Sequence, residues 1–286
     1  MQMRLITFSS DTGPRIAAVV GEKYVDLNQA DAAIPADPIE FLAGGSEVLA
    51  KAQAAAESGA GESRPANVLA PIPNPGKIIC IGLNYADHAA ESGAEIPSEP
   101  VTFCKFGTAV AADREAVLLP KLSEKVDYEA ELVVVIGKQG RHIPQTEAMS
   151  YVGGYTCGHD VSARDWQIGK PGGQWLLGKT FDGFAPFGPV LVTPDEVPNP
   201  GELRIALRLN GETMQDSNTR QLIFPIDHLI SYLSGVVTLE PGDVLFTGTP
   251  PGVGAARKPP VFIQDGDVAE VEIEGIGILT NSFVAE

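Results

Sequence analysis

The chain has 286 residues, of which 44% are hydrophobic and 20% are charged, and its formal net charge at pH 7 is −17. This hydrophobic content supports a real core and argues against disorder, and the length predicts one large domain with a small one. The acidity disfavours nucleic acid and anionic membranes as partners, because both are polyanions. If the substrate is also an anion, a bound cation would have to reverse the charge of the site locally.

The cysteines and the apolar runs indicate the cellular compartment in which the protein is expected. Cys80, Cys104 and Cys157 have no CxxC spacing and stand among apolar residues, which is typical of reduced core thiols in a cytoplasmic protein. No stretch approaches 18 apolar residues, and residues 1–10 lead into no long apolar run. We therefore expect a cytoplasmic protein without a membrane span.

The first part of the chain predicts a small α+β domain. Residues 3–28 alternate short apolar runs with turn residues, as a β meander does, and residues 38–58 predict helices separated at Gly44 and Gly45. The segment 59–76 is rich in Gly, Ser and Pro and predicts a boundary. The predicted domains are residues 1–70 and 75–286.

The second part predicts a mixed, β-dominated α+β fold. Many short strands and few helices argue against a doubly wound sheet and favour a sandwich or roll. One helix is expected at 84–90, with Asn84 as a candidate N-cap, and another at 225–235, where apolar residues have helical spacing. Strands are expected at 77–82, 101–106, 130–137, 190–193, 204–209, 243–247 and 268–273.

Three carboxylates stand beside apolar sequence. Glu129 and Glu131 are two apart at the start of an expected strand and therefore share a face, and Asp160 follows later in the chain. Buried together they would repel unless a cation neutralised them. Carboxylates without a His or Cys cluster suit Mg²⁺, Mn²⁺ or Ca²⁺. The alternative is a solvated acidic edge of a very acidic protein.

His88 and Glu91 form a second constellation. They are three apart on the expected helix and so lie on one face. A carboxylate beside an imidazole fixes its tautomer and raises its pKa, which makes a general base. The alternative is a surface histidine near an acidic helix end.

A third group follows Asp160 directly. Arg164 could clamp a substrate carboxylate with two hydrogen bonds, and Gln167 could donate to a carbonyl oxygen. The alternative is an ordinary helix start with a surface ion pair between Arg164 and Asp165.

Residues 173–180 match the pattern GxxxxGK[ST] of a phosphate-binding loop letter for letter. Such a loop must follow a strand and open a helix, but no strand precedes it here, and Gly183 and Pro186 stop any long helix. We therefore reject nucleotide binding. Lys179 stays of interest as a cation flanked by apolar residues, because such a lysine has a partner or a task.

The last motif is the Gly- and Pro-rich segment 247–254, which follows an expected strand. Such loops present backbone N–H groups and hydroxyls, here that of Thr249, to ligands. An ordinary turn is the alternative.

Taken in order, these segments resemble the fumarylacetoacetate-hydrolase family, especially its smaller acylpyruvase-like members. The resemblance covers about residues 75 to 286. Two departures are visible: Phe106-Gly107-Thr108 follows Lys105 where Pro-Ser-Thr is expected, and the shortest members lack the N-terminal extension. The matching segments are 82–85 with His88 and Glu91, 103–105, 127–131, 158–167, 178–179 and 247–254.

The resemblance implies a β-roll fold, a homodimer and a small 2-oxo or 1,3-dioxo carboxylic acid as substrate. By position it implies that the metal is held by Glu129, Glu131 and Asp160. His88 and Glu91 would be the catalytic dyad on a mobile lid, with Lys179 and Gln167 steadying an oxyanion. The substrate would meet Tyr85, Lys105, Arg164, Gln167 and Thr249.

The reaction expected first is metal-dependent hydrolysis of a carbon–carbon bond in an acylpyruvate or fumarylpyruvate. The metal would act as a Lewis acid and His88 would activate water. Oxaloacetate decarboxylation and keto–enol tautomerisation or diene-dioate isomerisation are alternatives on the same residues. A non-catalytic Ca²⁺-binding module is an alternative of another class.

Overall fold

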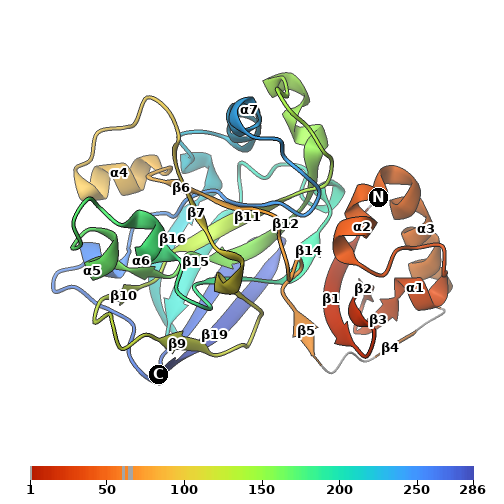
Figure 1. Cartoon of the computed structure of the whole chain (residues 1–286), viewed down its shortest axis with the longest axis horizontal. Coiled ribbons are helices and arrows are strands. Elements are labelled where there is room, and N and C mark those ends of the chain that lie inside the picture. The colour runs from red at the N-terminus through yellow and green to blue at the C-terminus, as the bar shows by residue number, and fades with distance from the viewer. Residues whose placement is uncertain (1, 60–61, 64–66) are drawn as a thin grey trace.

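The computed structural model describes residues 2–59, 62–63 and 67–286, and its N-terminal part is a small meander with helices against it (Figure 1). Strands β1, β2 and β3 pair in sequence as expected, and the two expected helices meet at Gly44 and Gly45. Asp37 caps the first of them by accepting the amides of Ile39 and Glu40. The elements are β1 (Arg4–Ser10), β2 (Gly13–Val20), β3 (Lys23–Asp26), α1 (Leu27–Ala30), α2 (Pro38–Ala43), α3 (Gly45–Ser58), β4 (Glu62–Ser63) and β5 (Val68–Leu69).

The main sheet of the described residues has 12 strands and runs through both parts of the chain, in the order β4-β3-β2-β1-β14-β12-β11-β17-β6-β7, with β5 on β1 and β8 on β14. Strand β1 pairs with β14 at Arg4 and Leu5, so a sheet crosses the predicted boundary between residues 70 and 75. The division into two domains stays a prediction. The further strands are β6 (Ile78–Gly82), β7 (Val101–Lys105), β8 (Val110–Ala111), β11 (Ala130–Ile136), β12 (Val152–His159), β14 (Ala185–Val192) and β17 (Val244–Phe246).

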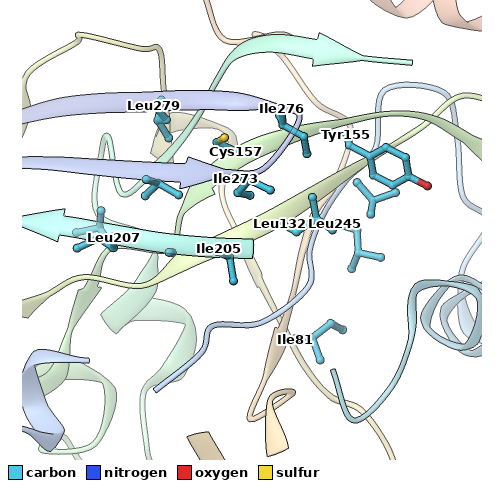
Figure 2. Packing of buried hydrophobic residues seen from close by; sticks show 14 of the residues in the cluster. Ile81, Leu132, Tyr155, Cys157, Ile205, Leu207, Leu245, Ile273, Ile276 and Leu279 are labelled. Carbon is cyan, nitrogen blue, oxygen red and sulfur yellow. The ribbon is translucent and has the colours of Figure 1, made fainter. Parts of the chain in front are cut away.

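A second sheet of five strands, in the order β16-β15-β18-β19-β9, packs against the main one. Figure 2 shows the shared core, in which Leu132 and Leu245 of the main sheet face Ile205, Leu207 and Ile273 of the second. Burial of such side chains contributes about 1.5–3 kcal/mol each. The strands are β9 (Val117–Leu119), β15 (Arg204–Leu209), β16 (Glu212–Asn218), β18 (Val268–Ile273) and β19 (Gly277–Ala285), and a separate pair is β10 (Val126–Asp127) with β13 (Ser162–Ala163).

The helices of the second part are short and lie around the sheets. They are α4 (Ala86–Ser92), α5 (Arg164–Gln167), α6 (Trp175–Lys179) and α7 (Ile226–Val236), with 3-10 turns at Gly107–Ala109, Gln145–Tyr151, Pro194–Glu196, Thr219–Gln221 and Gly254–Ala256. The mixed, sheet-dominated fold is confirmed. In the described part of the chain, no helix is long and apolar enough to cross a membrane.

Two local predictions were wrong, and strand β12 was not predicted. Asn84 is not an N-cap: its side chain is buried and bonds Phe224 and the carbonyl of Thr247, and α4 begins after Tyr85. Cys104 is exposed, because it lies on the outer strand β7. Strand β12 was missed because glycines interrupt its pattern; Gly153 is needed there, since a Cβ would lie 2.9 Å from Gly137 Cα.

Candidate metal centre and active site

Three carboxylates meet where β11 and β12 lie side by side. The two strands are antiparallel with Ala130 opposite His159, so the residue before β11 and the residue after β12 are neighbours. Glu129, Glu131 and Asp160 each offer an oxygen within 4.8 Å of the others, and all three are buried. Sequence spacing brought Glu129 and Glu131 together, and strand pairing adds Asp160.

The electrostatics of this triad fit a cation. Burial, and then the charges of Asp160 and Glu129, raise the pKa of Glu131 well above its usual range. A divalent ion would remove that strain by favouring the carboxylate form. The donors are hard oxygen atoms, which suit Mg²⁺, Mn²⁺ or Ca²⁺, and among the described residues no other group of three His, Cys, Asp or Glu is placed to hold a metal.

Two buried lysines border the triad. Lys179 Nζ lies 2.7 Å from Glu129 Oε2 and 2.9 Å from Asp160 Oδ2. Burial lowers the pKa of Lys179, but these two carboxylates more than offset it and raise the pKa. Lys105 Nζ lies 2.5 Å from Asp160 Oδ1 and also donates to the carbonyls of Val161, Lys179 and Phe184. Lys105 therefore lies behind Asp160.

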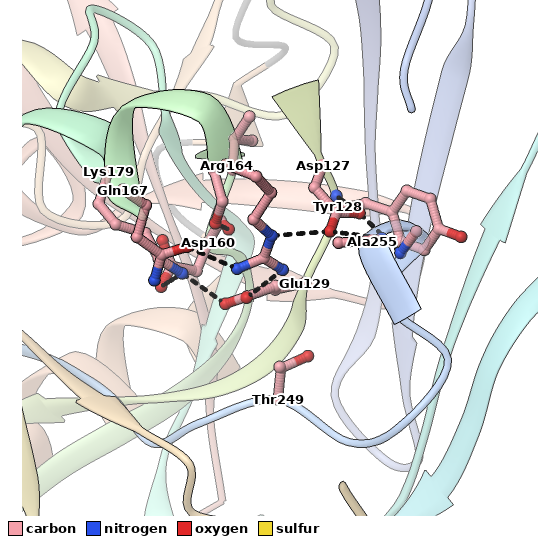
Figure 3. Close-up of polar contacts among 12 residues, drawn as sticks. Asp127, Tyr128, Glu129, Asp160, Arg164, Gln167, Lys179, Thr249 and Ala255 are labelled. Atoms are coloured by element: carbon pink, nitrogen blue, oxygen red, sulfur yellow. Dashed lines mark hydrogen bonds and ion pairs between the residues drawn. The ribbon is translucent and has the colours of Figure 1, made fainter. Parts of the chain in front are cut away.

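Arg164 links the triad to a carboxylate that the sequence analysis did not single out. Its Nη2 lies 2.7 Å from Glu129 Oε1, its Nη1 donates to Gln167 Oε1 at 2.9 Å, and its Nε donates to Asp127 Oδ2 at 2.8 Å (Figure 3). The pKa of Glu129 is lowered to about 2, because Lys179 and Arg164 outweigh the effect of its burial. The alternative interpretation, a surface ion pair between Arg164 and Asp165, does not hold, because Asp165 accepts from Ser123 and the amide of Glu124.

His88 and Glu91 both lie on α4, as predicted. His88 Nδ1 is 3.3 Å from Glu91 Oε2, and the two side chains are 15% and 30% exposed. Both oxygens of Glu91 also accept from the amide of Gly252, at 3.0 and 3.1 Å. Glu91 thus orients the imidazole and joins α4 to the Gly- and Pro-rich loop.

That loop serves the centre through its backbone. The amide of Gly248 donates to Glu131 Oε2 at 2.7 Å, and a Cβ on Gly248 would lie 2.7 Å from Asn84 Cβ. The hydroxyl of Thr249 accepts from Gln215, another buried residue that the sequence analysis missed. The segment 173–180, which matches the phosphate-loop pattern, contains a helix of only five residues, and the side chain of Lys179 at its end contacts carboxylates.

A cavity of about 100 Å³ opens onto these groups. Its cationic side is formed by Arg164 and Lys179, and its apolar wall by side chains that the sequence analysis did not assign. Of the predicted site residues, Glu91, Lys105, Asp160 and Tyr85 stand outside this lining. The residues that line it are Ile81, Gly82, Leu83, His88, Phe103, Glu129, Glu131, Arg164, Gln167, Trp175, Lys179 and Thr249.

Tyr85 is wholly buried beside the cavity. Its hydroxyl has no hydrogen-bond partner among the described residues, and burial, with the charge of Glu131, raises its pKa. A role in binding substrate would require α4 to move. That role stays a prediction.

Comparison with known proteins agrees with this fold. The family described as fumarylacetoacetate (FAA) hydrolase C-terminal matches residues 77–284. Oxaloacetate tautomerase fahd2, mitochondrial, of Xenopus laevis is 48% identical over 99% of this chain and 91% of its own length. Oxaloacetate tautomerase FAHD2A, mitochondrial, of Homo sapiens is 45% identical over 99% and 92%. The chain belongs to the fumarylacetoacetate-hydrolase family.

Solved structures support the same conclusion. The crystal structure of a putative HpcE protein from Mycobacterium smegmatis matches with a TM-score of 0.88 and 42% identity, over 99% of both chains. Maleylpyruvate hydrolase from Sphingobium sp. SYK-6 matches with a TM-score of 0.81 and 29% identity, over 100% of both chains. Members of this family are enzymes acting on small molecules, and relatives of this chain are named as tautomerases, isomerases and hydrolases.

The comparisons correct one expectation. The relatives from Xenopus laevis and Homo sapiens are both named mitochondrial, which contradicts the prediction of a cytoplasmic protein. That prediction relied on reduced cysteines and the lack of a signal-peptide pattern. Neither feature distinguishes the cytoplasm from other reducing compartments.

Proposed function

We propose that the protein is a divalent-metal-dependent tautomerase that interconverts the keto and enol forms of oxaloacetate. The observation that carries this proposal is the small cavity of about 100 Å³, which is lined by two carboxylates of the triad, Glu129 and Glu131, and by the side chains of Arg164, Lys179 and His88. That volume suits a four-carbon diacid better than a longer acylpyruvate. Relatives named as oxaloacetate tautomerases align over nearly the whole chain, which supports the same substrate.

The metal would be held by Glu129, Glu131 and Asp160, with Mg²⁺ or Mn²⁺ as the first choice and Ca²⁺ as an alternative. When bound, it supplies Lewis-acid polarisation of the 2-oxo acid unit. The chain's own cations then face the rest of the substrate. Glu129 and Asp160 raise the pKa of Lys179, which favours its protonated form and a role as a hydrogen-bond donor.

The proton transfers fall to His88 and its neighbours. In the keto-to-enol direction, His88 takes a proton from C3 and then delivers the same proton to the C2 oxygen, so one C–H bond breaks, one O–H bond forms and His88 returns to its neutral form. Glu91, 3.3 Å from Nδ1, fixes the tautomer that leaves Nε2 as the accepting atom. Lys179 and Gln167 stabilise charge on the C2 oxygen, an effect of about 3 kcal/mol per donor. We further propose that the enzyme acts as a homodimer, as the family resemblance implies.

The assay is the loss of enol absorbance after enol-oxaloacetate is added with Mg²⁺, with Mn²⁺ or with EDTA. The proposal predicts metal-dependent loss well above the buffer rate, with no pyruvate in a parallel assay. Pyruvate released in step with the loss of absorbance would identify a decarboxylase instead. No metal-dependent acceleration would contradict the proposal.

Hydrolysis of an acylpyruvate is the second candidate, because the His88–Glu91 pair could equally activate water. Acetylpyruvate would then yield pyruvate and acetate. The same metal and EDTA conditions test it, and acetylpyruvate turnover faster than enol-oxaloacetate turnover would put hydrolysis first.

A further inference from the structure

Asp127 is a buried carboxylate whose acceptor positions are all used. Oδ1 accepts the amides of Tyr128 and Gly254 at 2.8 and 2.7 Å, and Oδ2 accepts Arg164 Nε and the amide of Ala255 at 2.8 and 3.0 Å. Its side chain is not exposed at all. With four donors in place, it has no lone pair for a metal or for a substrate proton.

The backbone brings Asp127 to Arg164. Strands β10 and β13 pair with Asp127 opposite Ser162, and the amide of Arg164 donates to Lys125 at 2.9 Å. The backbone of Arg164 therefore lies beside β10, and its side chain extends along β10 to Asp127. Nothing in the linear sequence marks this pairing, because the two strands are only two residues long.

The guanidinium of Arg164 contacts three residues, and two of these residues belong to the site. Besides Asp127, it contacts Glu129 of the triad and Gln167 of the cavity wall. The planar fork cannot turn without breaking all three contacts. Figure 3 shows this series of contacts, from Ala255 through Asp127 and Arg164 to Glu129.

Without Asp127, Arg164 would keep only Glu129 as a charged partner. The guanidinium would then be free to shift toward Glu129, and its donors would leave the cavity. We propose that Asp127 is a positioning residue, which fixes Arg164 so that Arg164 and Gln167 present donors to a substrate carboxylate. This inference rests on the proposed function in one respect, which is that a carboxylic acid binds in the cavity.

The test is a double-mutant cycle with Asp127→Asn and Arg164→Lys. Asp165→Asn is the matched control, because Asp165 is also a partly buried carboxylate that accepts from Ser123 and backbone amides but does not contact the Arg164 side chain. For each variant, KM and kcat for enol-oxaloacetate are measured with Mn²⁺. Binding of oxalate, a small diacid, to the Mn²⁺-loaded enzyme is measured by calorimetry, and the melting temperature is recorded.

Asp127→Asn is expected to raise KM and weaken oxalate binding about 10-fold or more, which corresponds to losing one charge-assisted contact, while kcat changes less than about 3-fold. In the Arg164→Lys variant, adding Asp127→Asn should change KM and the affinity for oxalate by less than about a further 2-fold. Asp165→Asn should leave KM and oxalate affinity unchanged. Effects of Asp127→Asn and Arg164→Lys that multiply would overturn the proposal, because Asp127 would then act through the loop or the fold alone.

A second measurement covers the case in which Asp127→Asn does not fold. The Arg164 Nε–H group should give a slowly exchanging signal in the NMR spectrum of the ¹⁵N-labelled protein, assigned by its loss in Arg164→Lys. Absence of such a signal from the folded protein would contradict the proposal. If the protein turns over no oxaloacetate, the proposed function fails, while oxalate binding still tests Asp127.

Discussion

The metal centre and the segment around α4 are built differently. In the centre every carboxylate is buried and contacts a cation or a backbone amide: Lys179 joins Glu129 to Asp160, and Gly248 donates to Glu131. Helix α4 has seven residues and no side-chain N-cap. Two of its side chains reach other segments of the described chain: Glu91 accepts from the amide of Gly252, and Asp87 accepts from Ser217.

This difference separates two tasks. A centre held by many contacts keeps its geometry whether or not substrate is present, as a metal site requires. A helix of seven residues without a side-chain N-cap can move at lower cost, as entry and release of substrate require. We therefore expect changes in the centre to remove metal binding, and changes on α4 to slow proton transfer while metal binding persists.

The largest effect is expected from Glu131→Gln. Loss of this carboxylate should abolish turnover and lower the affinity for Mn²⁺ more than about 100-fold. Replacing a residue that only hydrogen-bonds to a metal ligand lowers metal affinity by up to roughly 100-fold, and here the ligand itself is lost. Calorimetric titration with Mn²⁺ and the enol assay measure both. Glu270→Gln, on β18 of the second sheet, is the matched control. Normal metal affinity in Glu131→Gln would place the ion elsewhere.

His88→Gln should act on the chemistry alone. Removing the base is expected to lower kcat about 10²- to 10⁴-fold, while Mn²⁺ affinity stays within about 3-fold. Glu91→Gln should have a smaller effect on kcat, because it keeps an oxygen for the amide of Gly252 but loses the charge beside the imidazole. A parallel loss of metal affinity would show that α4 and the centre are not separate.

Trp175→Ala tests the apolar wall between these two regions. The ring packs edge-on to Phe103, 5.6 Å between centroids, and a Cβ on Gly82 would lie 2.7 Å from it. Its removal should enlarge the cavity. The kcat/KM for a longer acylpyruvate, divided by the kcat/KM for enol-oxaloacetate, should rise about 10-fold or more. Leu177→Ala on the same helix is the control, since Leu177 is 42% exposed. An unchanged ratio would exclude Trp175 as a determinant of substrate length.

The smallest effect concerns stability, at His159 behind the centre. Burial, and then the charge of Lys105, lower its pKa to about 3. The folded protein keeps this imidazole neutral, whereas the unfolded chain binds a proton below about pH 6.5, so stability present above pH 6.5 is lost as pH falls toward 3. Between pH 6.5 and 5 the loss should be about 1.5 kcal/mol.

Urea unfolding of the wild type and of His159→Leu at both pH values, with EDTA present, measures this effect. The variant should lose less stability than the wild type on acidification, whatever its stability at pH 6.5. Equal losses would mean that His159 takes up its proton in the folded protein as well.

The sequence predicted those parts of the site that depend on local order. Glu129 and Glu131 share a face because alternate residues in a strand do, and His88 and Glu91 meet because they are three apart on a helix. Asp160 and Lys179 were singled out by their apolar neighbours, and the resemblance assigned their roles. Their placement in the structure follows from the register of β11 against β12 and from the short helix α6.

Other parts depend on contacts between distant segments. Asp127 reads in the sequence as one more acidic residue, and only the pairing of β10 with β13 brings it to Arg164. Gln215 reaches Thr249 from β16, and Phe103 on β7 contacts Trp175 on α6. Asn84 looked like a helix cap because Asn favours that position, but two loops take up its amide instead.

The central claim is that the buried acidic triad is a divalent-metal site. Anomalous diffraction from crystals grown with Mn²⁺ tests it most directly. The account predicts one strong peak bonded to oxygens of Glu129, Glu131 and Asp160, with Lys179 displaced from at least one of its two carboxylates. A triad without a peak, with Lys179 still bridging Glu129 and Asp160, would contradict it.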